Sequence, residues 1–238
     1  MSYITNKQDG FTLVEIAIVL VIIGVLLGGV LKGQELIKSA QVRNLIDQSS
    51  SIQAAYYGFV DRYHQIPGDM KGNAACKLIG NQVPGCPNGV GGDGSRIIDE
   101  DWKEASAVWA HLSAAGFIQG NYQGGATDET TYRDPAQAPA NAFGGLLVLS
   151  RSDGYRSATT RSSPKLNLVL GRNLPVGIIQ QLDVKVDEGQ PTTGTVRATG
   201  RDSFGEIGQG DPACVTEGAP PTWDINRDSS DCNAAVLY

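Results

Sequence analysis

The stretch GFTLVEIAIVLVIIGVLLGGVL, residues 10–31, decides how the chain is organised. From Phe11 to Leu31 there are 21 residues, and Glu15 is the only ionisable side chain among them. About 20 apolar residues in a helix are enough to cross the hydrocarbon core of a membrane. Inserting a carboxylate at the centre of a membrane helix costs about 2.5–3.5 kcal/mol on insertion scales. An acidic residue within such a helix therefore normally has a charged partner or a function.

The residues before this stretch, MSYITNKQDG, form a short polar leader. A secretory signal peptide has its own apolar region, which this leader lacks, so the apolar run itself must serve as the targeting signal. Lys7 favours a cytoplasmic N-terminus by the positive-inside rule, although Asp9 nearby weakens the charge bias. We therefore expect the bulk of the chain on the far side of the inner membrane.

Four features coincide here: a glycine, a phenylalanine after it, an acid at the fifth position from that phenylalanine, and the apolar run. Together with the polar leader, they resemble the class III signal of type IV prepilins and type II secretion pseudopilins. The resemblance implies that a membrane-embedded prepilin peptidase cuts between Gly10 and Phe11 and methylates the new amine of Phe11. It also implies that Glu15 takes part in assembly.

Beyond Lys32 the apolar residues recur at a spacing of three and four, which is typical of one buried helix face. The pattern predicts an unbroken helix from Phe11 to about Tyr63, ending before Pro67 and Gly68. The residues expected on its core face are Leu36, Ile37, Ala40, Val42, Leu45, Ile46, Ile52, Tyr56, Phe59, Val60 and Tyr63.

The rest of the chain predicts a mixed α+β arrangement. Residues 63–98 are rich in glycine and proline and predict a loop. The regular elements expected after it are a helix over 101–117, two antiparallel strands over 144–150 and 165–171, and a short helix over 175–187. Residues 67–69, 109–120 and 182–189, and Pro191 with residues 194–198 after them, resemble corresponding segments in a subgroup of large pilin-like proteins.

Four cysteines, Cys76, Cys86, Cys214 and Cys232, allow three sets of pairings. The two local pairs, Cys76 with Cys86 and Cys214 with Cys232, would close short loops, and no C-x-x-C metal or redox pair is present. Read together with an export signal, the cysteines predict two structural disulfides formed in an oxidising compartment, each worth about 2–4 kcal/mol.

The loop between Cys214 and Cys232 is a candidate calcium site. Asp224, Asn226, Asp228 and Asp231 could offer the hard oxygen ligands that calcium prefers. The resemblance to major pseudopilins, which bind calcium in a loop of their sheet region, adds weight. Against calcium, the loop lacks the glycine and the closing glutamate of an EF-hand, and Arg227 opposes a cation. We expect no cofactor, with calcium in this loop as the alternative.

A second oxygen-rich segment, NGVGGDG, spans residues 88–94. Asp93 is its only carboxylate, and the alternating acids of an EF-hand are missing. A cation there is less favoured than in the C-terminal loop.

Charge and composition exclude other classes of function. The formal net charge is −6 and the isoelectric point is about 4.9, so the chain lacks the clustered lysine and arginine of a protein that holds nucleic acid. The two histidines, His64 and His111, stand alone, without a Ser-His-Asp or Cys-His arrangement in the sequence. We expect no enzymatic activity and no specific nucleic-acid partner.

The fold class expected is α+β: a pilin-like fold in which a long N-terminal α-helix packs on an antiparallel β-sheet head with disulfide-tied loops. The expected divisions are a leader over 1–10, a transmembrane and filament-core half of the helix over 11–31, an amphipathic half over 32–66, and a globular head over 67–238.

The resemblance implies a structural subunit of a type IV pilus-like filament, assembled through its N-terminal helix. Glu15 would pair with the amine of Phe11 on a neighbouring copy. The expected partners are other copies of the chain, the prepilin peptidase and an inner-membrane assembly platform. The precursor would span the inner membrane once before entering a filament at the cell surface. The alternatives are a type II secretion pseudopilin in a periplasmic pseudopilus, and a minor or DNA-uptake pilin.

Overall fold

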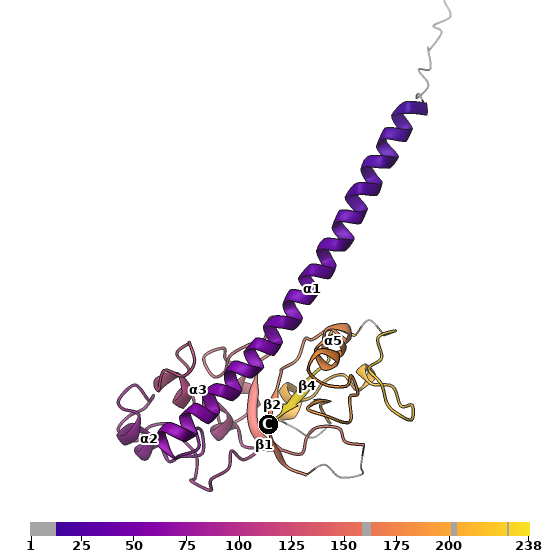
Figure 1. Ribbon diagram of the computed structural model, residues 1–238. Helices are drawn as coiled ribbons and strands as arrows, with labels where there is room; N and C mark the ends of the chain where they lie inside the picture. Colours follow the sequence, from indigo (N-terminus) through magenta and orange to yellow (C-terminus); the bar gives the residue numbers. More distant parts are fainter. Residues whose placement is uncertain (1–12, 159–162, 201–203, 228) are drawn as a thin grey trace, which may run out of the picture. The chain divides into compact units, whose positions relative to one another are not determined.

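The computed structural model describes residues 13–158, 163–200, 204–227 and 229–238. The chain divides into two compact units, residues 1–40 and 41–238. Helix α1 (Leu13–Tyr63) crosses the boundary between the two units (Figure 1). The predicted long helix is therefore confirmed over the described residues, with its C-terminal end at Tyr63.

The buried face of α1 begins at Val42. Its members follow the predicted spacing of three and four residues: Val42, Leu45, Ser49, Ile52, Ala55, Tyr56 and Phe59. These side chains form part of the hydrophobic core of the second unit. The periodic half of the helix is thus a core element, as the sequence predicts.

The prediction that this core face starts at Leu36 is wrong. Leu36 and Ile37 are 62% and 61% exposed. Both residues precede Gln41, where the second compact unit begins, so they belong to a part of the helix without a core of its own. Periodicity alone does not reveal where the packing partner of a helix starts.

In the described part of the chain, four strands form one antiparallel sheet in the order β1-β2-β4-β3 (Figure 1). The strands are β1 (Val148–Ser152), β2 (Lys165–Val169), β3 (Val196–Ala198) and β4 (Ala234–Leu237). Val148 lies opposite Val169, and Leu168 lies opposite Val236. The predicted pairing of the first two strands is confirmed, with β1 shifted towards the C-terminus.

Besides α1, the described residues form several shorter helices. They are α2 (Gly72–Leu78), α3 (Trp102–Ala114), α4 (Glu129–Tyr132), α5 (Val176–Val186) and α6 (Gly205–Gly208), with a 3-10 turn at Pro212–Cys214. The predicted helices over 101–117 and 175–187 are confirmed as α3 and α5, each ending slightly earlier. The prediction of loop throughout 63–98 is wrong, because α2 forms there before the glycine-rich stretch that begins at Gly80.

Helix α3 packs against β1 and is buried on several sides from Glu104 to Leu112. Trp109 is fully buried, and its indole Nε1–H donates to the Tyr132 hydroxyl at 2.9 Å. Tyr132 in turn donates to the Leu147 carbonyl at 2.7 Å. The polar end of each buried ring is therefore satisfied, which burial requires.

The end of the chain fastens the sheet to α1. Tyr238, the residue after β4, donates its hydroxyl to the Ser49 carbonyl at 2.9 Å. A second contact of 3.2 Å joins this hydroxyl to the Ser49 side chain. Because β4 lies between β2 and β3, this bond ties the middle of the sheet to the core face of the helix.

The structure joins the cysteines in the two local pairs, Cys76–Cys86 and Cys214–Cys232. The first pair lies 10 residues apart and holds the end of α2 to the following loop, and the second lies 18 residues apart. Such crosslinks stabilise a fold mainly by restricting its unfolded chain. They suit a unit with long irregular segments.

Asp183 is a fully buried carboxylate on α5. Its Oδ2 accepts a hydrogen bond from Trp223 Nε1 at 2.7 Å, and its Oδ1 accepts one from the Gly189 backbone at 3.3 Å. Burial raises the pKa of Asp183 to about 6, although these hydrogen bonds oppose the rise. This carboxylate links α5 to the loop between Cys214 and Cys232.

We expect Phe59→Ala to lower the free energy of unfolding by about 3–5 kcal/mol, since this side chain is fully buried. Its ring lies 4.7 Å from the Tyr63 ring and 5.9 Å from the Phe117 ring, measured between centroids. Tyr57→Ala is the matched control on the same helix, because Tyr57 is 50% exposed and should cost less than about 1 kcal/mol. Urea unfolding of the two variants measures both effects, and equal losses would contradict this description of the helix faces.

The indole resonance of Trp223 should titrate with a midpoint near pH 6, because it reports ionisation of Asp183. The pKa of Asp183 in the folded chain exceeds the ordinary aspartate value of 3.8, so the folded chain holds this proton more tightly than the unfolded chain does. Ionisation of Asp183 therefore lowers the free energy of unfolding at pH values above about 6. This destabilisation is relieved as the pH falls from about 6 to 3.8.

NMR spectra of the indole N–H groups between about pH 4 and pH 8 measure this titration. Trp109 is an internal control, since its indole bonds to a tyrosine hydroxyl that does not ionise in this range. Asp183→Asn should abolish the Trp223 shift. A midpoint near 4 in the unaltered chain would show that burial does not raise this pKa.

Candidate functional site

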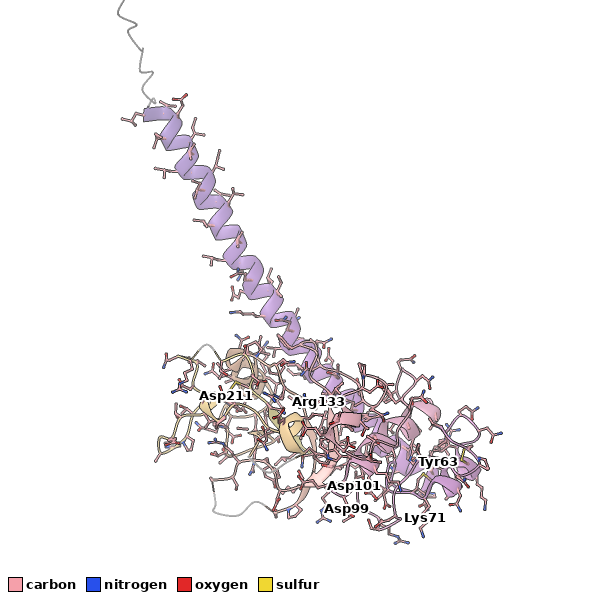
Figure 2. All side chains as sticks on the ribbon, turned by 180° about the vertical axis from the view of Figure 1, so that it is seen from behind. Tyr63, Lys71, Asp99, Asp101, Arg133 and Asp211 are labelled. Atoms are coloured by element: carbon pink, nitrogen blue, oxygen red, sulfur yellow. A yellow bond between two sulfur atoms is a disulfide. The ribbon has the colours of Figure 1, made fainter. Side chains whose placement is uncertain are left out.

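The apolar part of α1, residues 13–31, is exposed along its whole length. Each of its large apolar side chains, from Leu13 to Leu31, is between 46% and 86% exposed. Among the described residues, α1 is the one helix long and apolar enough to cross a membrane, and its most apolar 18-residue window has a mean hydropathy of 2.8 with no residue buried. Figure 2 shows these side chains on all sides of the helix. Such a surface requires lipid or other apolar helices around it.

The length of this segment matches a bilayer. At a rise of 1.5 Å per residue, residues 13–31 span about 28 Å, close to the hydrocarbon thickness of about 30 Å. The segment ends at Lys32, whose Nζ lies 2.7 Å from a carboxylate oxygen of Glu35. Both side chains are about two-thirds exposed, and the bond from Lys32 lowers the pKa of Glu35. The charged pair therefore marks where the uninterrupted run of apolar side chains ends.

Glu15 lies in the first turn of α1 and is exposed. A carboxylate in the first turn is stabilised by the partial positive charge at the N-terminus of a helix. Gly10 and Phe11, the predicted processing and methylation residues, lie outside the described residues. The pairing of Glu15 with the Phe11 amine of another copy stays a prediction.

Glycines inside the apolar segment leave its surface open. An added Cβ at Gly24, Gly28 or Gly29 would meet nothing within 4 Å. No contact within the described chain therefore requires a glycine at these positions. Small residues at such positions allow neighbouring membrane helices to approach closely.

The predicted calcium ligands of the C-terminal loop do not form one group of free oxygens. Asp231 pairs with Arg172, whose Nε lies 2.9 Å from Oδ1 and whose Nη2 contacts Oδ2, and this bonding lowers the pKa of Asp231. Asp224 lies 3.9 Å from Arg227, and Asn226 is exposed. Asp228 lies outside the described residues. Calcium here stays a prediction, and it would compete with Arg172 for Asp231.

The structure brings together three carboxylates that the sequence analysis did not combine. Among the described residues, Asp69, Asp93 and Glu104 place one oxygen each within 4.8 Å of one another, a spacing that could hold a cation. Asp93 belongs to the glycine-rich segment 88–94, Asp69 to the turn after Pro67, and Glu104 to α3. The oxygen-rich loop was the available signal, but its partners are distant in sequence.

The three carboxylates already have hydrogen-bond donors. Glu104 accepts from the backbone N–H groups of Asp93 at 3.1 Å and Asp99 at 2.8 Å, while Asp69 accepts from Arg96 N–H at 2.9 Å. Burial raises the pKa of Glu104, and the charges of Asp69 and Asp93 raise it further, against the lowering effect of the two backbone bonds. The cluster thus fastens the loop over residues 92–99 to α3.

His111 has a structural role. Its ring is fully buried, Nδ1 accepts from the Gly68 N–H at 2.9 Å, and Nε2 lies 2.9 Å from the Val90 carbonyl. These contacts require a neutral ring protonated at Nε2, and burial lowers the pKa of His111 to about 4. Both nitrogens are engaged in joining two loops, so neither serves as a base or a metal ligand here.

Comparison with family models matches residues 5–31 to the prokaryotic N-terminal methylation motif. The matched range contains Gly10, Phe11, Glu15 and the exposed apolar segment of α1. No curated protein and no solved structure matches the chain. The chain therefore carries the prokaryotic N-terminal methylation motif, the hallmark of type IV pilins and pseudopilins.

Proposed function

We propose that the chain is a structural subunit of a type IV pilus-like filament, cut between Gly10 and Phe11 and assembled through its N-terminal helix. The observation that carries the proposal is the exposed apolar segment 13–31, which lies within the methylation motif and contains one acid. The precursor spans the inner membrane with a cytoplasmic N-terminus. The prepilin peptidase and an inner-membrane assembly platform are its partners before it joins other copies in the filament.

Burial of apolar surface supplies most of the cohesion of such a filament. Each buried Val, Leu or Ile side chain contributes about 1.5–3 kcal/mol relative to exposure in water. A subunit leaving lipid gains less than this, because its helix is already in apolar surroundings. Helix packing and the exclusion of water then hold the assembled fibre together.

The charge pair supplies the register between copies. At about 4 Å and an effective dielectric constant near 20, Glu15 and the Phe11 amine of a neighbour attract by around 4 kcal/mol before desolvation is subtracted. A wrong axial offset leaves both charges unpaired in apolar surroundings. One offset between neighbouring helices is therefore strongly preferred.

Glu15→Ala should leave processing intact and reduce incorporation into filaments at least tenfold, because it removes the charge that selects the register. Glu15→Gln should do the same with little change in shape. Glu35→Gln is the matched control, since Glu35 lies beyond the apolar segment and pairs with Lys32 within the same helix. Immunoblots measure processing, and mass spectrometry of sheared filaments measures incorporation. Normal filaments from Glu15→Ala would rule out the proposed pairing.

Gly10→Asp should block cleavage and leave the 238-residue precursor in the membrane, because the residue before the cut must thread into the peptidase. Asn6→Asp adds the same charge within the leader and serves as the control. Mass spectrometry of the membrane fraction distinguishes precursor from a chain that begins at N-methylated Phe11. Efficient cleavage of Gly10→Asp would place the processing site elsewhere.

Electron microscopy with mass spectrometry of sheared fibres separates a pilus from a pseudopilus. Long fibres built mainly from this chain support a major pilin. A processed chain that stays in the envelope, with no surface fibre containing it, favours a type II secretion pseudopilin. A small proportion of the chain in fibres made of another subunit favours a minor pilin.

A further inference from the structure

A cavity of about 570 Å³ lies within the second unit, between the loop that follows α2 and the segment that follows α3. Its volume is within the range of about 300–1,000 Å³ that is usual for pockets of small ligands. Four side chains of its wall carry a carboxamide: Asn81, Gln82, Asn121 and Gln123. Residues 83–87 form the rest of the wall, and no lining residue of this amide-lined cavity carries a charge.

The four amide groups keep their hydrogen-bonding capacity for a ligand. All four residues are exposed, and none of their side chains makes a hydrogen bond to another described residue. A carboxamide has two N–H donors and an oxygen that can accept two hydrogen bonds. The wall therefore offers donors and acceptors side by side.

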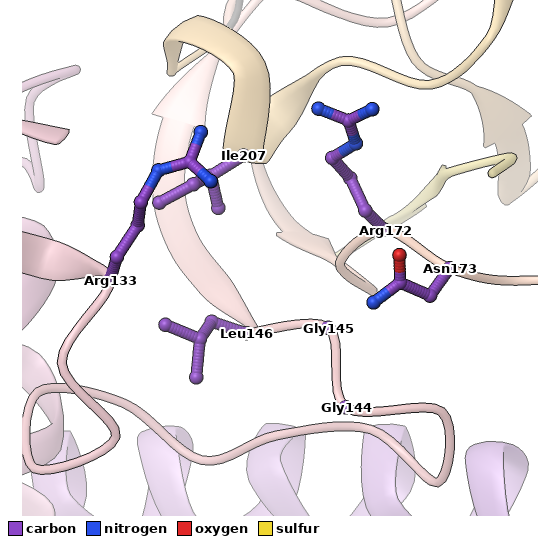
Figure 3. A pocket seen from close by; sticks show the side chains of 7 residues that line it. All are labelled: Arg133, Gly144, Gly145, Leu146, Arg172, Asn173 and Ile207. Atoms are coloured by element: carbon purple, nitrogen blue, oxygen red, sulfur yellow. The ribbon is translucent and has the colours of Figure 1, made fainter. Parts of the chain in front are cut away.

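A second cavity, of about 260 Å³, differs in this respect (Figure 3). Arg133 and Arg172 line it. Arg133 Nη2 lies 2.5 Å from a Glu129 oxygen and 2.8 Å from a Glu206 oxygen. Arg172 pairs with Asp231. Because these guanidinium groups are already bound to carboxylates, the amide-lined cavity is the better candidate for a ligand.

The walls of the amide-lined cavity are fixed by the fold. On one side, a disulfide joins Cys86 to Cys76 of α2, and Val83 is buried in the hydrophobic core. On the other side, the Gln123 backbone N–H donates to the Ala136 carbonyl at 2.7 Å. Binding therefore requires little ordering of these two segments, which lowers the entropy that a ligand must overcome.

The chemistry of the wall disfavours several classes of ligand. An ion would find no opposite charge among the lining residues, and a nucleobase would find no aromatic ring to stack on. A peptide strand pairs with a free strand edge. Here the Pro84 and Gly85 carbonyls already accept hydrogen bonds from N–H groups of the same loop.

An uncharged sugar ring fits these features. Each of its hydroxyl groups donates and accepts, so two neighbouring hydroxyls can bond the oxygen and the nitrogen of one carboxamide. Pro84 and Pro87 add apolar surface beside the amides, on which the C–H groups of a sugar can pack. We propose that the amide-lined cavity binds an uncharged hexose residue of a glycan, held by hydrogen bonds from the four carboxamides.

This site does not depend on the proposed filament, and the test uses the full chain in micelles of a zwitterionic detergent without a sugar head group. Calorimetric and NMR titrations with the methyl glycosides of glucose, galactose and mannose should give saturable binding by at least one of them. The affinity should be in the millimolar range, because hydrogen bonds to the ligand replace hydrogen bonds to water. The side-chain amide resonances of Asn121 and Gln123 should shift during this titration. Sorbitol, which keeps the hydroxyl groups and lacks the ring, should bind at least fivefold more weakly.

Gln123→Ala should weaken binding of that glycoside at least threefold, because it removes one carboxamide from the wall. Gln181→Ala is the matched control, since Gln181 is an exposed glutamine on α5 outside the cavity, and it should leave binding unchanged. Asn121→Leu, which removes an amide and keeps a side chain of similar size, should also weaken binding at least threefold. Thermal unfolding of each variant checks that it is folded.

Four results would each overturn the proposal. They are no saturable binding of any of the three glycosides, equal binding of sorbitol, amide resonances of Asn121 and Gln123 that do not shift, and unchanged binding in folded Gln123→Ala or folded Asn121→Leu.

Discussion

The structure depends on helix α1, whose two halves lie in different surroundings. From residue 13 to residue 31 the side chains of α1 are apolar on every side and exposed, which only lipid or other helices can accommodate. From Val42 onward one face is buried in the core of the second unit, and Arg43, Asp47 and Asp61 lie on exposed positions. The boundary between the two compact units therefore lies inside one unbroken helix and is not marked by a break in secondary structure.

In the second unit, buried polar groups fix the loops beside the hydrophobic core. Its sheet is short, and long segments of loop must be fixed by particular contacts. His111 joins the turn at Gly68 to the loop at Val90, and Asp183 joins α5 to the loop containing Trp223. Each of these groups is buried, so removing one partner leaves the other without its hydrogen bond, at a cost of about 1–3 kcal/mol. The disulfides act on the same loops by limiting the unfolded chain.

Features signalled by neighbouring residues could be predicted from the sequence, and features made by distant residues could not. The long helix, α3, α5 and the pairing of β1 with β2 each have a local pattern. The sequence analysis did not predict β3 and β4, because both strands are short. They are defined by long-range pairing, of β4 with β2 and of β3 with β4. The same reason explains why the sequence analysis did not find the carboxylate cluster of the second unit: Asp69, Asp93 and Glu104 are distant in sequence and come together only in the fold. The motif at residues 5–31 is contiguous, which is why it could be recognised.

The exposed apolar segment and the buried core lie in different parts of the chain, so substitutions that affect assembly need not affect folding. The apolar side chains of residues 13–31 are exposed, so a substitution there removes little buried surface and should change the stability of the second unit little. A substitution in the second unit, such as one at Trp109 or Asp183, instead acts on buried contacts far along the chain from the methylation motif. Effects of distant sites without shared partners are close to additive. A substitution in the second unit can therefore change the folding of that unit without altering the segment that would join one copy to the next.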